Sequence, residues 1–135
     1  LSKYWKSGPK SFLGLLVPNF PNLFIVSGPG SPSVLTNVPV QIEQHVEWIT
    51  KCIKFLENNK RQSIESTNVA ANKWQKEIMN SVKKTLFMKA KSSWYKGDNI
   101  PGKSKSFLPY PGGMPKYRKA CLKAEKTNYK ELKII

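Results

Sequence analysis

The segment LFIVSGPGSPSVLTNVP, residues 23–39, is the most informative part of the sequence for the predicted fold. Its first four residues are apolar and predict a short buried strand, residues 23–27. Residues 27–33 are rich in Gly, Pro and Ser and cannot continue a strand. Asn37 then supplies a capping side chain and Pro39 lies in the first turn of a predicted helix. Strand, glycine loop and helix form the unit with which α/β proteins aim a helix N-terminus at a ligand, although an ordinary βα turn has the same pattern.

The predicted helix runs from about residue 38 to residue 57. We expect it to bury one face, made of apolar side chains spaced three and four residues apart: Ile42, Val46, Ile49, Ile53 and Leu56. His45 is the only histidine and lies beside this face, with no cysteine or acid at ligand spacing. We interpret His45 as a packed or hydrogen-bonded side chain rather than a catalytic one.

Two further helices are predicted. The first covers about residues 68–89, is capped by residues 65–67 and buries Ala71, Trp74, Ile78 and Val82. Trp74 is therefore expected in the core rather than at a ligand. The second begins near Pro115 and carries Tyr117, Cys121 and Ala124 on adjoining faces. Short strands are also expected within residues 12–17 and at residues 107–110.

Length and charge limit the classes of function. The 135 residues suit one domain, and the net charge of +15 is concentrated in residues 51–135. Its lysines are scattered at helical spacing, which favours solvated helix faces over a nucleic-acid surface. No run is long enough to span a membrane, and two cysteines without metal spacing suggest free thiols in a reducing, cytoplasmic compartment. Because the chain opens on Leu1, we expect a piece of a longer protein.

Known catalytic motifs are missing from the sequence. There is no Cys/His metal cluster, no nucleophile with a plausible histidine partner, and Gly28-Pro29-Gly30 lacks the third glycine of a dinucleotide fingerprint. Residues 91–113 lose all regular pattern but hold adjacent aromatic residues and lysines. Such loops often carry function, although Trp94 would also serve as the anchor of a surface excursion.

Several distinctive stretches follow one another along the chain: residues 5–9, 12–14, 20–24, 28–33 and 42–48, Trp74, and residues 93–95, 99–103, 112–113 and 117–118. Together, and in this order, they resemble the C-terminal part of a flavin-dependent Baeyer–Villiger monooxygenase. The resemblance covers nearly the whole chain, and only the Lys-rich end from about Lys126 carries little of it.

The resemblance implies an α/β fold that is incomplete and helix-rich, with a few short strands. Residues 1–135 would form the C-terminal segment of the FAD domain in a flavoprotein with two dinucleotide-binding domains. In that family NADPH reduces FAD, O2 adds to form a peroxyflavin, and a ketone is converted to an ester or lactone. The implied partners are a small ketone, O2 and the remainder of the FAD and NADP domains, with no nucleic acid.

The resemblance also assigns residues. Residues 91–113 would be a mobile loop that covers NADP and substrate. The substrate would be contacted by Ser33, Val34, Leu35 and Leu108. The cofactors would be contacted by Gly28, Pro29, Leu35, Thr36, Asn37, Val38, Trp94 and Lys103. No catalytic residue is assigned, because the family's glycine fingerprint, signature motif and arginine are absent from the chain, so the fragment alone should be inactive.

Two alternatives remain open at this point. Flavin monooxygenases that oxygenate nitrogen or sulfur share the fold, although the Trp94 loop favours the Baeyer–Villiger branch. The second alternative is a small basic module that binds an acidic partner. A fragment should leave an apolar face uncovered around residues 13–16 and 23–25, whereas an independent module should bury it.

Overall fold

A computed structural model describes residues 1–90, 93–97, 101–102, 104 and 106–135. Within these residues the fold is α/β and helix-rich. The α-helices are α1 (Val38–Asn58), α2 (Asn68–Val82) and α3 (Met114–Lys126). The 3-10 helices are η1 (Ser33–Leu35), η2 (Leu86–Lys89) and η3 (Trp94–Lys96). The strands β1 (Ile64–Ser66) and β2 (Leu132–Ile134) form an antiparallel pair in which Ile64 lies opposite Ile134.

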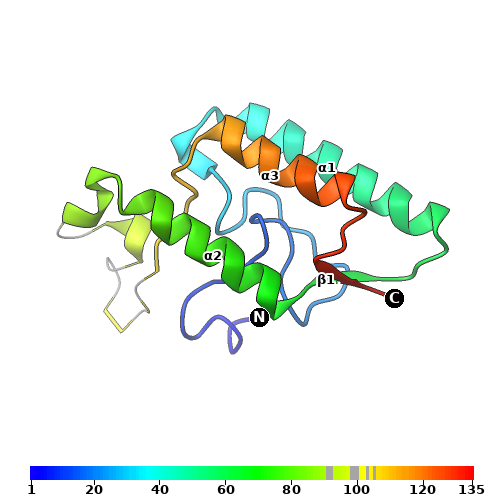
Figure 1. Cartoon of the computed structure of the whole chain (residues 1–135). Helices are drawn as coiled ribbons and strands as arrows, with labels where there is room; N and C mark the ends of the chain where they lie inside the picture. The colour runs from blue at the N-terminus through cyan, green and yellow to red at the C-terminus, as the bar shows by residue number, and fades with distance from the viewer. Residues whose placement is uncertain (91–92, 98–100, 103, 105) are drawn as a thin grey trace.

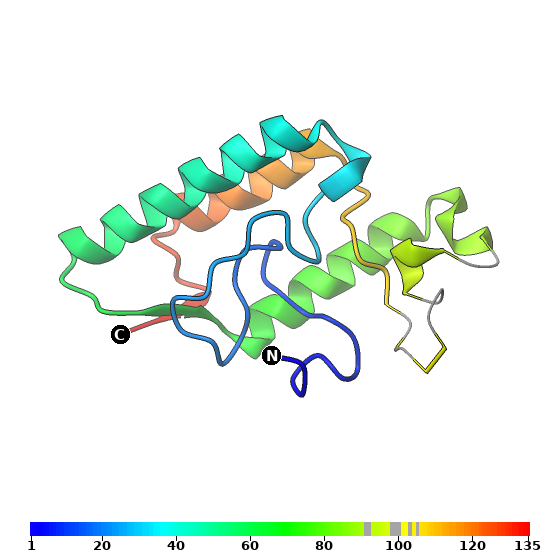
Figure 2. The ribbon, with the colours of Figure 1, turned by 180° about the vertical axis from the view of Figure 1, so that it is seen from behind.

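The helices form two layers around an irregular N-terminal segment. Helices α1 and α3 lie side by side, and α2 lies on the other side of the chain that precedes α1 (Figures 1 and 2). Leu13, Leu15 and Leu16 of this central segment are fully buried together with Trp48 and Ile78. The core therefore forms around loops rather than around a sheet.

The start of α1 is as predicted, but its buried face is not. The side-chain oxygen of Asn37 accepts a hydrogen bond from the Val40 N–H at 3.3 Å, which confirms the cap. The buried residues are Gln41, His45, Trp48, Cys52 and Leu56.

Of the five predicted core positions of α1, only Leu56 is buried. Ile42, Val46 and Ile53 are 39%, 49% and 41% exposed, and Ile49 is half-buried. The polar residues Gln41 and His45 take the inner positions because both find hydrogen-bond partners there: the Gln41 amide donates to Ser27 and Ser31, and His45 bonds to Tyr117.

The buried faces of α2 and α3 are confirmed. Ala71, Trp74, Ile78 and Val82 are buried on α2, and Tyr117, Cys121 and Ala124 on α3. The Trp74 indole N–H donates to the Gly30 carbonyl at 2.9 Å, as befits a core residue. Helix α2 ends at Val82, earlier than predicted, because the chain turns and Thr85 caps η2.

The strand predicted at residues 23–27 is wrong. Only an isolated bridge pairs Phe24 with Leu16, and Val26 is exposed. Asn22 and Ser27 flank the segment in the left-handed region, with φ of 59° and 56°. Within the described part of the chain no strand of two or more residues pairs with this segment, so its β propensity does not produce a strand here.

The other two predicted short strands are also absent from the described residues. Residues 12–17 fold back on themselves, since Leu13 and Gly14 have φ of 58° and 72°. Residues 107–110 form single backbone hydrogen bonds with the glycine loop but no ladder.

Exposure of apolar surface differs from the prediction as well. Leu13, Leu15 and Leu16 are buried, so the expected open face around them is wrong. Residues 23–25 are half-buried, and four of the exposed large apolar side chains lie on α1: Val40, Ile42, Val46 and Ile53. Both cysteines are buried free thiols, as predicted, and burial raises the pKa of Cys52 to about 12. None of the helices in the described ranges is long and apolar enough to cross a membrane.

Candidate functional site

A pocket of about 160 Å³, called here the loop pocket, brings together residues from three separate segments. Residues 27–29 form one wall, Ser33 of η1 a second, and Trp94 of η3 with residues 108–109 the rest. Five residues predicted at the site line it: Gly28, Pro29, Ser33, Trp94 and Leu108. Ser27 and Pro109 also line it, and nothing in their sequence environment singled them out.

Five of the remaining predicted residues, 34–38, lead from the loop pocket to the N-terminus of α1. Val34 is exposed, Leu35, Thr36 and Val38 are half-buried, and Asn37 is exposed. They continue the chain directly from Ser33, but they are not among the lining residues of the pocket. Lys103 lies outside the described residues.

The glycine loop is held in one conformation from several sides. Ser11 donates to the Pro29 carbonyl and accepts from the Gly14 N–H at 3.0 Å. The Gly30 N–H donates to the Leu108 carbonyl at 2.6 Å. A Cβ at Gly28 would stand 2.5 Å from the Gly14 carbonyl oxygen, so only glycine fits there. The loop wall of the pocket is therefore preformed.

A buried relay ties the same loop to α3. The Ser27 N–H donates to His45 Nδ1 at 3.0 Å, which leaves the imidazole proton on Nε2. That N–H donates to the Tyr117 hydroxyl oxygen at 2.8 Å, and Tyr117 donates to the Leu13 carbonyl at 2.6 Å. Burial lowers the pKa of His45 to about 4, so the imidazole is neutral near pH 7. The interpretation of His45 as a hydrogen-bonded structural residue is confirmed.

The start of α1 offers unused hydrogen-bond donors. Asn37 receives the N–H groups of Val40 and Gln41, through its side chain and its carbonyl respectively. Among the described residues, no hydrogen bond is donated by the N–H of Asn37 or Val38. No acidic residue lies in the first turn. The two N–H groups and the positive end of the helix dipole therefore suit a carbonyl oxygen, a ring nitrogen or an anion.

Trp94 presents an accessible indole at the rim of the loop pocket. Its side chain is 47% exposed, and its ring lies 4.2 Å from the ring of Tyr95 between centroids. The Tyr95 carbonyl accepts from the Leu108 N–H at 2.8 Å, which fixes η3 beside the pocket. Within the described part of the chain the indole N–H has no acceptor. Trp94 is thus positioned by its neighbour rather than buried as a packing anchor.

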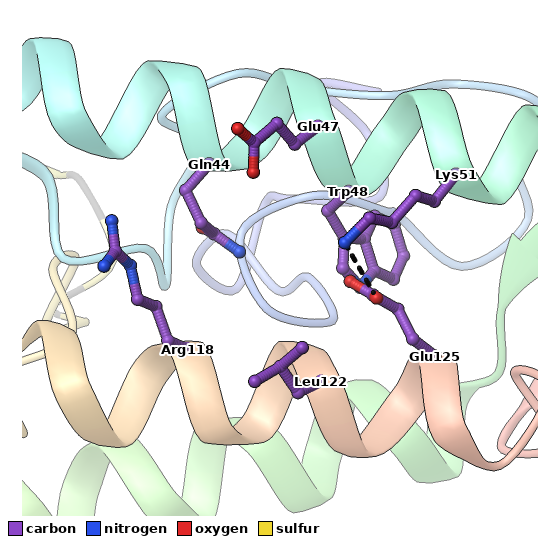
Figure 3. Close-up of a pocket in the computed structure, with 7 residues that line it drawn as sticks. All are labelled: Gln44, Glu47, Trp48, Lys51, Arg118, Leu122 and Glu125. Carbon is purple, nitrogen blue, oxygen red and sulfur yellow. Dashed lines mark hydrogen bonds and ion pairs between the residues drawn. The ribbon is translucent and has the colours of Figure 1, made fainter.

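A larger groove of about 270 Å³ lies between α1 and α3 (Figure 3). Lys51 and Glu125 form an ion pair across it at 3.2 Å, and the Trp48 indole closes its floor by donating to the Cys121 carbonyl. None of the predicted site residues lines this groove. No group of three His, Cys, Asp or Glu side chains suited to a metal ion occurs in the described residues.

The known proteins most similar in sequence that we compared are all monooxygenases. The chain is 44% identical over 118 residues to a cyclohexanone 1,2-monooxygenase of Acinetobacter sp., matching 87% of this chain and 21% of that protein. It is 39% identical over 128 residues to a Baeyer–Villiger monooxygenase of Pseudooceanicola batsensis, matching 95% of the chain and 23% of the relative. A phenazine N-monooxygenase of Lysobacter antibioticus is 38% identical over 129 residues, which cover 96% of the chain and 23% of the relative. No protein-family model matches the chain.

Solved structures agree with the sequence relatives. A cyclohexanone monooxygenase from Rhodococcus sp. bound to NADP+ superposes with a TM-score of 0.92 at 36% identity, over 98% of this chain and 24% of that one. A complex of OTEMO with FAD and NADP superposes with a TM-score of 0.88 at 30% identity, over 100% of this chain and 24% of that one. The chain thus spans less than a quarter of the length of these proteins.

Proposed function

Because this chain belongs to the Baeyer–Villiger monooxygenase family of flavoproteins, we propose that it is the C-terminal segment of the FAD domain of such an enzyme. The enzyme would use NADPH and O2 to insert one oxygen atom beside the carbonyl of a ketone, giving an ester or lactone. The observation that carries the proposal is the loop pocket, where five residues predicted to contact cofactor or substrate meet from three segments.

The residues at the start of α1 fit FAD. The unused N–H groups of Asn37 and Val38 are donors for the N1 and C2 carbonyl edge of an isoalloxazine, where negative charge develops on reduction. Gly28, Pro29, Leu35 and Thr36 would supply the adjoining contacts. When bound and reduced by NADPH, FAD supplies the activation of O2 that no side chain here provides.

The loop pocket, together with the adjoining residues of η1, suits the ketone and the nicotinamide cofactor. Ser33, Val34, Leu35 and Leu108 would contact the ketone through a mostly apolar surface. Trp94, with its exposed indole N–H, would hold NADP as residues 91–113 cover the site, with Lys103 in the same segment. This closure would exclude water, which protects the oxygenation from unproductive loss of the activated oxygen.

The test uses a chimera, in which this chain replaces the homologous segment of the Acinetobacter cyclohexanone monooxygenase. We expect the purified chimera to retain FAD and to convert cyclohexanone to its lactone with about one NADPH oxidised per lactone. The isolated chain should show neither FAD binding nor turnover. A chimera that folds but holds no FAD, or holds FAD and makes no lactone, would contradict the proposal.

Oxygenation of nitrogen is a second candidate because of the phenazine N-monooxygenase relative. The same chimera assayed with a phenazine separates the two reactions by product. A small basic module that binds an acidic partner finds no support in the comparisons, since the relatives are monooxygenases.

A further inference from the structure

The side chain of Gln41 bridges the two serines that flank the glycine loop. Its amide nitrogen Nε2 donates to the Ser27 hydroxyl oxygen at 2.9 Å and to the Ser31 hydroxyl oxygen at 3.3 Å. Gly28 and Pro29, which lie between the two serines, line the loop pocket. Gln41 itself is fully buried and is not a lining residue. It can therefore act on a bound molecule only through the loop.

Ser27 is held from two sides and keeps one hydrogen-bond donor in reserve. Its backbone N–H donates to His45 Nδ1 at 3.0 Å, which fixes the main chain. Its hydroxyl oxygen accepts from the Gln41 amide, so the hydroxyl hydrogen points away from that amide. Ser27 is half-buried and lines the loop pocket, and its hydroxyl donates to no acceptor among the described residues. The pocket thus contains a hydroxyl donor with a restricted orientation.

Ser31 binds the same amide but belongs to the interior. It is fully buried and does not line the loop pocket. Its backbone N–H donates to the Gly28 carbonyl at 3.0 Å, and its carbonyl accepts from the Tyr110 N–H at 2.7 Å. Gln41 therefore has one partner in the interior and one partner in the pocket, and the two can be removed separately.

We propose that Gln41 is a positioning residue that aims the Ser27 hydroxyl into the loop pocket, where this hydroxyl donates to a carbonyl oxygen of a bound molecule. The inference rests on the proposed function. Two molecules of that reaction carry such an oxygen: the ketone, and NADP through the carboxamide of its nicotinamide ring. The apolar walls formed by Leu108 and Pro109 would strengthen the hydrogen bond by excluding water.

The cost of the Gln41 side chain agrees with a role at the site. Its carbonyl oxygen Oε1 is buried and has no hydrogen-bond partner among the described residues. A buried acceptor without a partner lowers stability, so an apolar side chain would serve the core better at this position. Departures of this kind from the best core packing are typical of residues that support a functional site.

The test is a double-mutant cycle in the chimera, with Ser27→Ala, Gln41→Met and the double variant. Two constants are measured: the KM for cyclohexanone and the Kd of NADP+, the latter followed by the flavin absorbance. Ser27→Ala should raise one of them about three- to tenfold, as expected for the loss of one hydrogen bond, and the constant that rises identifies the bound carbonyl. Gln41→Met should raise the same constant about threefold or more, and the double variant should match Ser27→Ala within about twofold. The flavin content should not change.

Two further variants separate positioning from stability. Ser31→Ala removes the interior partner of the same amide, so it should lower the melting temperature without changing either constant. Gln41→Glu keeps the length of the side chain but offers an acceptor that draws the Ser27 hydrogen out of the pocket. It should raise the same constant as much as Ser27→Ala does, which provides a test if Gln41→Met does not fold.

Three results would overturn the positioning role. They are unchanged constants in Ser27→Ala, a lower melting temperature with unchanged constants in the Gln41 variants, and effects of Ser27→Ala and Gln41→Met that add in the double variant. A chimera that shows the predicted coupling in NADP+ binding but makes no lactone would contradict the proposed function alone.

Discussion

The Nε2 atom of His45 lies 2.8 Å from the hydroxyl oxygen of Tyr117, and both side chains are buried. This contact joins α1 to α3 and, through the Ser27 N–H, fixes the first residue of the loop pocket. Every donor in the relay has an acceptor, so the direction of donation is determined. It runs from Ser27 to His45, from His45 to Tyr117, and from Tyr117 to Leu13. The shape of the candidate site therefore depends on two residues that do not line it.

Tyr117→Phe should destabilise the chimera by about 1–3 kcal/mol, because it leaves the His45 N–H and the Leu13 carbonyl buried without partners. Tyr129→Phe is the matched control, since Tyr129 is equally buried but its hydroxyl makes no hydrogen bond within the described residues. Urea unfolding of both variants measures the difference. Equal losses of stability would show that the relay contributes nothing.

Stability should fall with acid through His45. Its pKa is lowered to about 4 in the folded chain, against an ordinary value of 6.5, so the unfolded state takes up the proton first as the pH drops. The contribution is fully present above pH 6.5 and is lost progressively towards pH 4. We expect His45→Gln to have a lower but flatter pH–stability curve across this window. Parallel curves for the two proteins would refute the assignment.

Trp94→Ala should leave FAD bound, lower lactone formation and raise NADPH oxidation that ends in hydrogen peroxide. The reason is that the exposed indole lines the loop pocket without supporting the core. Trp94→Phe keeps a ring against Tyr95 but removes the N–H, and so separates stacking from hydrogen bonding. Flavin content, lactone and peroxide are measured on one preparation. Loss of FAD together with stability would instead make Trp94 a packing anchor.

Asn37→Asp should lower the reduction potential of bound FAD, because it places a negative charge beside the edge where reduction adds negative charge. An aspartate keeps the helix cap, and Asn37→Ser is the control that keeps the cap without the charge. Photoreduction with a reference dye measures both potentials. An unchanged potential in Asn37→Asp would place the flavin elsewhere.

The sequence predicted those features that depend on local chemistry. Side-chain type and spacing predicted four of these features: the Asn37 cap, the buried faces of α2 and α3, the core position of Trp74 and the structural role of His45. The glycine loop was predicted as an irregular segment between residue 26 and α1, which the structure confirms.

Features that depend on distant partners were not predictable in the same way. Residues 23–26 have strand propensity, but a strand needs a neighbouring strand, and the described residues do not supply one. The apolar stripe of α1 was assigned to the core, although Gln41 and His45 take the inner positions through bonds to Ser27 and Tyr117. Helical periodicity identifies an apolar face, but it does not tell whether that face packs into the core of this chain or against a more distant partner.

The position of the bound flavin is the sharpest test of the proposed function. We predict that the structure of the chimera with FAD bound places the Val38 amide nitrogen at hydrogen-bonding distance, about 2.7–3.2 Å, from the N1 or O2 atom of the isoalloxazine. Trp94 and Ser33 should then lie on the side of the ring that faces the loop pocket. An isoalloxazine bound away from residues 27–38, for example at the groove between α1 and α3, would contradict the assignment of these residues to the flavin site.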